Sequence, residues 1–429
     1  MQKKSIFSWY FNSNLLVRIL CGLILGGIVG ILFSDNKDII PYISPFGDVF
    51  IRLLKMIVLP VIVASLVVGA ASIEPSRLGK IGIKILAFYI LTSFFAIIVG
   101  LFFGQIFSPG EGLNLVGSAD AVAKTTTAPT LVEVFTNMIP KNPFGAISNG
   151  KVLPTIIFCL FFGLSLAHCR ESEQENIKKS AEVVYNFFEG VNEIIFKVVA
   201  WIMQYAPIGV FALIFTVFAK NGSAAFGPLL DVTGTVYAAL ITQGLVVYGV
   251  LAILFKLNPF KFFKRVIQPM VTAFVTRSSG GTLAVSMETA EHQMGIHRNV
   301  YGFTLPIGAT INMDGTTIYL GVCAMFIANA VGIPLDFTAQ ATIIVTAVLA
   351  SIGTAGVPGA GAIMLIMVLE SVGLKIEEGS AVAAAYAMIF GIDALLDMGR
   401  TSMNVVGDML GTTVVAKSEN EMDMSKWED

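Results

Sequence analysis

Charged residues, histidine and cysteine are all scarce in this sequence, and each shortage argues against a class of function. Only 13% of the 429 residues are charged, against about 25% in soluble globular domains, which disfavours a water-soluble enzyme. A net charge of −2 provides no basic field for nucleic acid. With three histidines and no CxxC pair, a His/Cys metal centre has little material. We interpret the four cysteines as small apolar packing residues: Cys21, Cys159, Cys169 and Cys323.

Long apolar runs take the place of charge, since 55% of the residues are hydrophobic. A bilayer core of about 30 Å needs roughly 20 apolar residues in a helix. The first run is too long for a signal peptide and lacks an A-x-A cleavage site, so we interpret it as a retained span. The first half is expected to cross the membrane at about 15–33, 49–71, 81–107, 153–168, 183–219 and 232–255, while 131–147 is too broken to assign.

Basic residues are distributed unevenly between these runs. If the N-terminus lies inside the cell, the inner connections carry more Lys and Arg than the outer ones, as the positive-inside rule requires. The inner set is Arg77, Lys80, Lys84, Arg170, Lys178, Lys179, Lys256, Lys261, Lys264 and Arg265, and the outer set is Lys37, Lys124, Lys141, Lys151 and Lys220. This orientation places the Ser/Thr/Gly-rich loop at 108–129 outside, where we expect it to be mobile.

In the second half, polar and glycine clusters interrupt the apolar runs. They are RSSGGT at 277–282, NMDGT at 312–316, SIGTAGVPGAGA at 351–362 and a polar series that begins at Asp393. Within hydrocarbon, broken backbone is tolerated only where it is buried in protein or lines a cavity. Several breaks in one half therefore indicate a single shared site.

The polar series falls on one side of a helix. At about 100° per residue, its members span an arc of about 100°: Asp393, Asp397, Arg400, Thr401, Asn404 and Asp408. An alternative is a self-neutralising salt-bridge ladder, in which Asp397 and Arg400 pair at i, i+3. Three carboxylates against one guanidinium still leave negative charge, which favours an outside cation.

The other clusters also have two interpretations. NMDGT offers the oxygen ligands that hard cations prefer, although a buried polar network that locks helix packing is the alternative. The two Ser/Gly clusters, each between short apolar arms, predict two re-entrant hairpins. Their free N–H groups suit a carboxylate, and small-residue helix packing is the alternative.

These residues resemble the glutamate transporter family, also called dicarboxylate/amino acid:cation symporters. The resemblance runs from about 265 to 417 and rests on NMDGT, the serine-containing tip at 277–282 and GIDALLDMGRT at 391–401; YILTS at 89–93 extends it loosely to the first half. It implies an all-α integral membrane protein of eight transmembrane helices and two oppositely oriented re-entrant hairpins, with inverted repeats. It also implies a homotrimer in the lipid bilayer of a prokaryotic inner membrane, with both termini cytoplasmic, and an elevator-type mechanism.

The resemblance also implies how the chain is divided. Residues 1–72 would hold scaffold helices 1 and 2, residues 73–107 helix 3 of the transport domain, and residues 108–219 the external loop and scaffold helices 4 and 5. The rest of the transport domain would occupy 220–429, with helix 6, a first hairpin at about 258–292, helix 7, a second hairpin at about 335–373 and helix 8.

The family pattern implies a substrate site for an acidic amino acid. It places the side-chain carboxylate on Arg400 with help from Thr316, and the ammonium on Asp397. The chemistry agrees, because a guanidinium grips a carboxylate bidentately. Relatives that take C4-dicarboxylates lack the aspartate and those that take neutral amino acids lack the arginine, so the resemblance favours L-aspartate or L-glutamate. The other implied substrate residues are Arg277, Ser278, Ser279, Val357, Gly361, Thr401 and Asn404.

The same pattern implies three sodium sites, whose ions would be co-transported ligands rather than resident cofactors. The first comprises Asp408 with Gly308, Asn312 and Asn404; the second Thr310, Met313, Ser351, Ile352 and Thr354; the third Tyr89, Thr92, Ser93, Asn312 and Asp314. Coupling to protons, with an acidic amino acid or a C4-dicarboxylate as substrate, is the alternative, because suitable oxygens do not identify the ion.

Two positions depart from the family pattern: Gly280 replaces a serine at the first tip, and Ala284 replaces a proline. A pure channel is a competing function, but two opposed hairpins favour alternating closure. An intramembrane protease is the enzymatic alternative. Its candidate groups lack a neighbouring histidine or lysine base and a GxGD motif, so we expect no enzyme; they are Ser278, Ser279, Asp314 and Asp408.

Overall fold

The computed structural model describes residues 15–34, 37–72, 78–113, 115, 136, 139–222, 226–352, 354, 356–377 and 379–428, most of which are helical. Within these residues the only β-bridge joins Ile296 and Met422. The loop predicted to be mobile at 108–129 lies mostly outside the described residues. Residues 131–135, 137 and 138 of the unassigned stretch at 131–147 also lie outside them, and the end of that stretch enters the short helix α6 (Pro143–Ser148).

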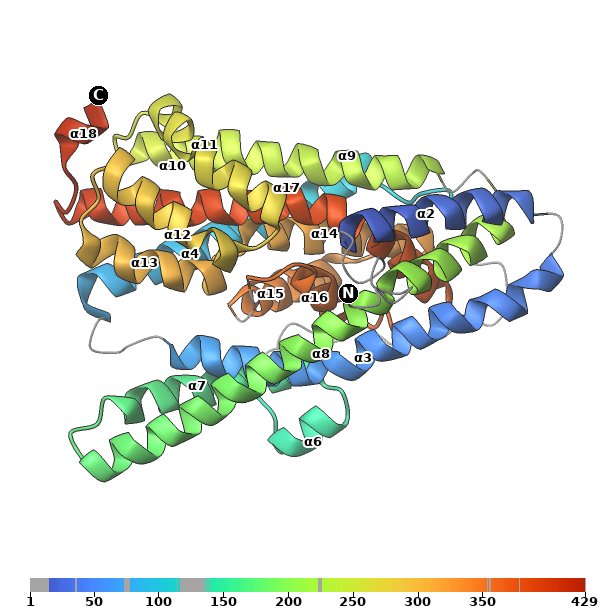
Figure 1. Cartoon of the computed structure of the whole chain (residues 1–429), viewed down its shortest axis with the longest axis horizontal. Coiled ribbons are helices and arrows are strands. Elements are labelled where there is room, and N and C mark those ends of the chain that lie inside the picture. Colours follow the sequence, from blue (N-terminus) through green and yellow to red (C-terminus); the bar gives the residue numbers. More distant parts are fainter. Residues whose placement is uncertain are drawn as a thin grey trace, which may run out of the picture.

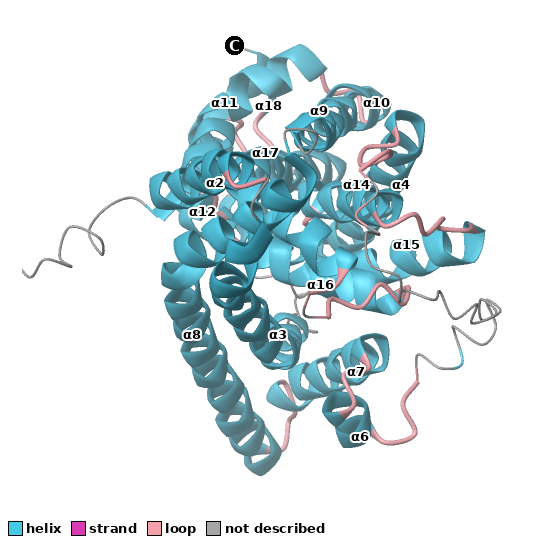
Figure 2. Ribbon diagram, turned by 90° about the vertical axis from the view of Figure 1, so that its right-hand side faces the viewer, coloured by secondary structure: helices cyan, strands magenta, loops and turns pink. Residues whose placement is uncertain are grey.

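One group of helices comes from the first half of the chain. α3 and α8 pack along each other, α2 packs on α8, and α7 contacts both α3 and α8. Figure 2 shows α3, α6, α7 and α8 in the lower part of the molecule, apart from α4, α9 and α11. The group consists of α2 (Leu15–Leu32), η1 (Lys37–Ile39), α3 (Ile40–Ala71), α7 (Val152–Arg170) and α8 (Glu175–Asn221).

The second group surrounds a helix that is broken in the middle. α4 and α17 pack on α14, and α11 and α13 pack on α17 (Figure 1). Its elements are η3 (Leu78–Gly82), α4 (Ile83–Phe107), α9 (Phe226–Thr242), η5 (Gln243–Tyr248), α10 (Gly249–Leu254), α11 (Pro259–Thr276), α12 (Ser279–Glu288), η6 (Thr289–Gln293), α13 (Arg298–Ile311), α14 (Asp314–Ala330), α15 (Phe337–Ser351), α16 (Ala360–Ser371), α17 (Ala381–Ser418) and α18 (Met424–Glu428).

Six helical stretches among the described residues are long and apolar enough to cross a bilayer: Ile40–Ala71, Lys80–Phe107, Glu175–Lys220, Phe226–Leu254, Arg298–Ala330 and Ala381–Ser418. Four shorter apolar helices accompany them. Helices α3 and α8 begin at Ile40 and Glu175, before the predicted span starts at 49 and 183. The first turn of α8 is polar, so a hydropathy window does not include it. The first turns of α3 contain Pro41 and Pro45, and proline is a weak signal for a helix.

The apolar window of the broken helix, α13 and α14, is completely buried. This position follows from its packing partners, because α4, α9, α15, α16 and α17 all contact α14. The break that NMDGT predicts is present, since α13 ends at Ile311 and α14 begins at Asp314. The polar residues at the break therefore lie in the interior of the protein, as broken backbone requires in a membrane.

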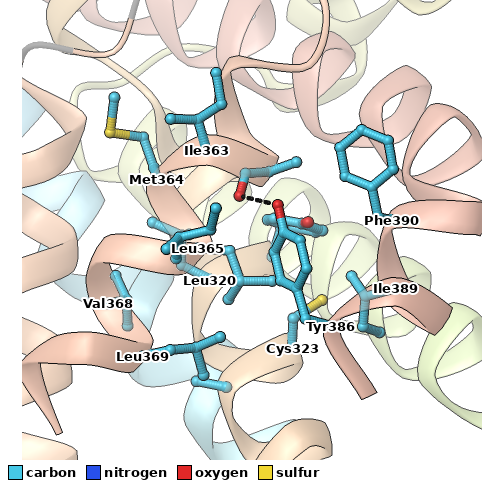
Figure 3. Packing of buried hydrophobic residues seen from close by; sticks show 14 of the residues in the cluster. Leu320, Cys323, Ile363, Met364, Leu365, Val368, Leu369, Tyr386, Ile389 and Phe390 are labelled. Carbon is cyan, nitrogen blue, oxygen red and sulfur yellow. Dashed lines mark hydrogen bonds between the residues drawn. The ribbon is translucent and has the colours of Figure 1, made fainter. Parts of the chain in front are cut away.

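Beside α14, the core is filled by apolar side chains from three helices. Figure 3 shows Leu320 and Cys323 of α14 against Leu365 of α16 and Tyr386 of α17. The Tyr386 hydroxyl donates to the Ala362 carbonyl at 3.0 Å, so its polar end is satisfied inside an apolar cluster. Cys159 and Cys323 are buried and free, as predicted for packing residues, whereas Cys21 is exposed on α2.

The C-terminal segment is tied to the end of the α11 and α12 pair. The Arg265 side chain donates to the carbonyls of Lys426 and Trp427 and lies over the Trp427 ring. His297 Nδ1 lies 2.7 Å from Glu421 Oε2. These contacts, with an ion pair between Lys84 and Glu419, place the end of the chain beside the start of α4.

Candidate substrate and cation site

The polar residues of α17 lie on one buried stripe, as the periodicity predicts. Arg400 donates from Nε to Asp397 Oδ1 at 2.9 Å. It also donates to both oxygens of Asp393, at 2.6 and 3.3 Å. The salt bridge that was the alternative interpretation of this stripe is therefore present. Two buried carboxylates share one guanidinium, so the group keeps a net negative charge.

Two further residues, Tyr319 and Gly361, confine the Arg400 guanidinium. Its central carbon lies 4.3 Å from the centroid of the Tyr319 ring, a distance at which a cation is attracted to the ring face. On another side, a Cβ at Gly361 would lie 2.8 Å from the same carbon. Only glycine at 361 lets α16 come this close to the arginine.

Helices α11 and α12 form one pair and α15 and α16 another, and the connection within each pair is its tip. A small cavity lies over Arg400, where the two tips meet the break before α14. Every predicted substrate residue except Ser278 lines it. The hydroxyl of Ser279 is buried and has no hydrogen-bond partner, so it is available to a ligand. The lining residues are Arg277, Ser279, Met313, Thr316, Thr354, Gly356, Val357, Ala360, Gly361, Asp397, Arg400, Thr401 and Asn404.

Asn404 connects α17 to the start of α14. Its Oδ1 accepts from the backbone N–H groups of Gly315 at 2.8 Å and Thr316 at 3.3 Å, and its Nδ2 donates to Thr316 Oγ1 at 3.2 Å. The first N–H groups of a helix have no partner within it. Asn404 satisfies two of them and so holds the broken helix against the polar stripe.

The tips of the two helix pairs are joined by hydrogen bonds. The Gly356 carbonyl accepts from Ser278 Oγ at 2.7 Å and from the Gly280 N–H at 3.3 Å. Ser278 also caps α12, because its Oγ accepts from the Gly281 N–H at 2.9 Å. The hydroxyl predicted to contact substrate is therefore placed between the tips instead of in the cavity wall.

Replacing Gly356 with alanine is expected to weaken the binding of L-aspartate, one of the two predicted substrates, about tenfold. The added Cβ would lie 2.8 Å from the Ala309 carbonyl oxygen and 2.9 Å from the Gly280 nitrogen, both backbone atoms. The tips would separate and lose two hydrogen bonds of about 0.5 to 1.5 kcal/mol each. Calorimetric titration of the purified protein measures the effect.

Gly280→Ala is the matched control for this experiment. Its Cβ would meet only the Gly356 carbonyl oxygen, at an ordinary 3.6 Å, so its affinity should stay within about twofold of the original. Equal affinities for the two variants would contradict a role of the tip contact in binding.

Asp408 lies at the first predicted cation site. Asn312 Nδ2 donates to its Oδ1 at 2.9 Å and to the Asn404 carbonyl at 3.1 Å. A Cβ at Gly308 would lie 2.7 Å from Asp408 Oδ1 and 2.6 Å from the Tyr89 hydroxyl. The structure thus brings together all four residues of this set.

Asp314 lies at the third predicted set, between α4 and η5. Ser93 Oγ donates to its Oδ1 at 2.7 Å and the Tyr248 hydroxyl to its Oδ2 at 2.7 Å. Thr92 Oγ1 lies 3.4 Å from Asn312 Oδ1. Asp314 is fully buried and has no ion pair among the described residues.

The second predicted cation set is brought together only in part. Met313 and Thr354 line the same cavity. The hydroxyls of Thr310, Ser351 and Thr354 each donate to a carbonyl in their own helix or its end. In the described part of the chain, no side-chain hydrogen bond joins Thr310 to Ser351 or to Ile352.

Four residues of these groups were not predicted as site residues. Asp393 and Tyr319 contact Arg400, and Gln243 and Tyr248 lie beside Asp314. Asp393 was visible as part of the polar stripe. Gln243 carried a usable signal as well, since a buried amide inside an apolar span needs partners.

The chain is also similar to known proteins along most of its length. A profile described as "Sodium:dicarboxylate symporter family" matches residues 15–418. The chain is similar to a proton/sodium-glutamate symport protein of Geobacillus stearothermophilus, at 37% identity over 417 residues that cover 95% of each chain. It is 32% identical to a proton/glutamate-aspartate symporter of Escherichia coli (strain K12), over 95% of this chain and 94% of that protein. A C4-dicarboxylate transport protein of Rhodopseudomonas palustris (strain HaA2) is 34% identical, over 97% and 90%.

Proposed function

The chain belongs to the sodium:dicarboxylate symporter family, and from that premise we propose that it couples the uptake of L-aspartate or L-glutamate to sodium. The family and the relatives compared above are transporters, so the protein is a multi-span membrane symporter and not an enzyme. No resident cofactor enters this proposal, because the sodium ions travel with the substrate.

The contact between Arg400 and Asp397 in the cavity wall carries the substrate proposal. A guanidinium and a carboxylate 2.9 Å apart present opposite charges to one small space. An acidic amino acid has a carboxylate for the first and an ammonium for the second, so it can replace the internal ion pair with two charge-assisted contacts. Asp393 would keep Arg400 oriented during this exchange, because it holds the guanidinium through different nitrogens.

Asp314 and Asp408 support the cation proposal. Both are buried, and their hydrogen-bond partners among the described residues are hydroxyls and an amide. A buried carboxylate without a positive partner is costly, and oxygen-rich surroundings suit a hard cation such as sodium. Since binding of ion and substrate is reciprocal, sodium should raise the affinity for the amino acid.

We further propose the family architecture for this chain. Helices α2, α3, α7 and α8 would form a scaffold, past which the group around α14 moves as an elevator, and the pairs α11/α12 and α15/α16 would enter the membrane from opposite sides. Most helix contacts lie within one group or the other, with α8 and α17 among the few pairs that join them, and this supports the division. Eight spans, a homotrimer and an inner-membrane location belong to the same proposal.

The orientation proposal places both termini in the cytoplasm. In Figure 1 the connection between α7 and α8, the start of α4 and the turn between α10 and α11 lie toward the same end of the molecule. These regions hold most of the basic residues that the positive-inside rule assigns to the inner side. The C-terminal segment lies at that end too, because Glu419 pairs with Lys84.

Binding of L-aspartate to the purified protein in sodium chloride and in choline chloride, at one pH, tests the substrate and the ion together. We expect binding in sodium only, because sodium would neutralise the carboxylates beside the site. Equal binding in both salts would favour proton coupling, the alternative that the names of two relatives also support. Absence of binding in both would reject aspartate and turn the test to glutamate and then to C4-dicarboxylates.

A further inference from the structure

The helix that faces Asp314 changes its winding at the cation site. Residues Gln243–Tyr248 form a π-helical turn, η5, between α9 and α10. Such turns are rare in proteins, and those that occur are often found at functional sites. Their wider winding changes the direction of the side chains. Here both ends of the turn carry a polar side chain, Gln243 and Tyr248, and both are fully buried. η5 packs against α4 and α17.

Tyr248 shows that this turn reaches the Asp314 carboxylate. Its hydroxyl donates to Asp314 Oδ2 at 2.7 Å. The approach depends on glycine in α17, because a Cβ at Gly407 would lie 2.5 Å from the Tyr248 hydroxyl and 2.5 Å from Asn312 Nδ2. The turn, the carboxylate and the Asn312 amide therefore meet in one buried space.

Gln243 brings an unused oxygen into the same space. Its Nε2 lies 3.5 Å from the Thr92 carbonyl oxygen, and its side chain interacts with both Asp314 and Tyr248. Its Oε1 is buried and has no hydrogen-bond partner. The nearby hydroxyl donors of Ser93 and Tyr248 are already used by the carboxylate. A buried acceptor without a donor is unfavourable, so its presence here requires an explanation.

We propose that Gln243 Oε1 is a ligand of the cation bound at Asp314, so that η5 contributes to a site otherwise formed by α4 and the broken helix. A neutral amide oxygen is a suitable ligand for a hard cation, and it adds no charge beside a carboxylate that one monovalent ion can balance. The free oxygen is then satisfied when the ion is bound. This assignment rests on the proposed sodium coupling.

Gln243→Leu tests the assignment, because leucine has a similar size but no oxygen. Thermal unfolding of the purified protein is followed against sodium concentration without substrate, and L-aspartate binding is then measured at saturating sodium. We expect the sodium midpoint to rise at least about fivefold, because the variant removes one of the oxygen ligands of the ion. Aspartate affinity at saturating sodium should return to within about twofold of the original. A purely structural role would not separate the two readouts.

Thr346→Val is the matched control. Its Oγ1 is likewise buried without a partner, but it lies on α15 and belongs to none of the three predicted cation sets, so its sodium midpoint should not move. If Gln243→Leu does not fold, Gln243→Asn keeps the amide but withdraws it by one methylene and should show the same shift to a smaller degree. A wild-type protein that responds to sodium while the Gln243 variants keep its midpoint overturns this assignment alone. A wild-type protein that does not respond to sodium overturns the proposed coupling and this assignment with it.

Discussion

Replacing Arg400 with alanine is expected to abolish the transport of acidic amino acids. The substrate carboxylate would lose its only cationic partner in the cavity besides Arg277, together with its bidentate grip. The protein would also lose the charge that balances Asp393 and Asp397. Leaving buried charges unpaired costs about 3 to 5 kcal/mol, so both binding and stability should fall.

A compensating variant separates these two effects. Combining Arg400→Ala with Asp393→Asn removes one of the two abandoned carboxylates and should restore much of the stability, measured by thermal unfolding, but not the binding of L-aspartate. Arg400→Lys retains a charge but not the planar fork and should bind weakly. Aspartate affinity that is unchanged in the stabilised double variant would refute the role of Arg400 as the carboxylate ligand. Uptake of neutral amino acids by that variant would support it.

Replacing Gly315 with alanine is expected to have the second large effect. A Cβ at this position would lie 2.1 Å from the Arg400 carbonyl oxygen and 2.7 Å from its Cα. The obstacle is backbone on both sides, so α14 would have to move away from α17. The Asn404 contacts with the start of α14 would be lost with it. Overpacking of this kind costs typically 1 to 3 kcal/mol and occasionally more, and we expect the upper end and a loss of transport.

Gly302→Ala provides the comparison for Gly315→Ala. Gly302 lies in α13, and the nearest atom to its added Cβ is Arg298 Cγ at 3.8 Å. Alanine is a better helix former than glycine by about 0.8 to 1 kcal/mol, so this variant should unfold at the same or a higher temperature than the wild type. Similar melting temperatures for the two variants would show that the contact between α14 and α17 is more tolerant than the distances indicate.

Much of the helical layout could be predicted from the sequence, because a membrane imposes a length and a composition on each span. The break at NMDGT was also visible, since asparagine, aspartate and glycine interrupt an apolar run. The starts of α3 and α8 were not, because α8 begins with a polar turn and α3 begins with the prolines Pro41 and Pro45. A helix can extend beyond the part that crosses the membrane. The membrane-crossing part has a strong hydropathy signal in the sequence, and the end of the helix does not.

The candidate site could likewise be predicted only in part. The polar stripe on α17 could be predicted from the spacing of its residues, because the geometry of a single helix determines which side chains share a face. The partner of Arg400 depends on how far a side chain reaches, and Asp393 is preferred alongside Asp397 only once the Tyr319 ring and Gly361 confine the guanidinium. Gln243 and Tyr248 come from a helix whose sequence is otherwise apolar. Only the packing of η5 on α4 and α17 brings them to Asp314.

The Gly356 carbonyl gives the meeting of the two tips a further meaning. It accepts two hydrogen bonds from the α11/α12 tip, one from the Ser278 hydroxyl and one from the Gly280 N–H. Neither pair of helices can therefore move away from the other without breaking both bonds. A carbonyl released in this way needs water as a replacement, so the tips can separate only where water can enter the cavity. Opening of the cavity would therefore depend on its hydration, because water has to replace the hydrogen bonds of the Gly356 carbonyl when the tips separate.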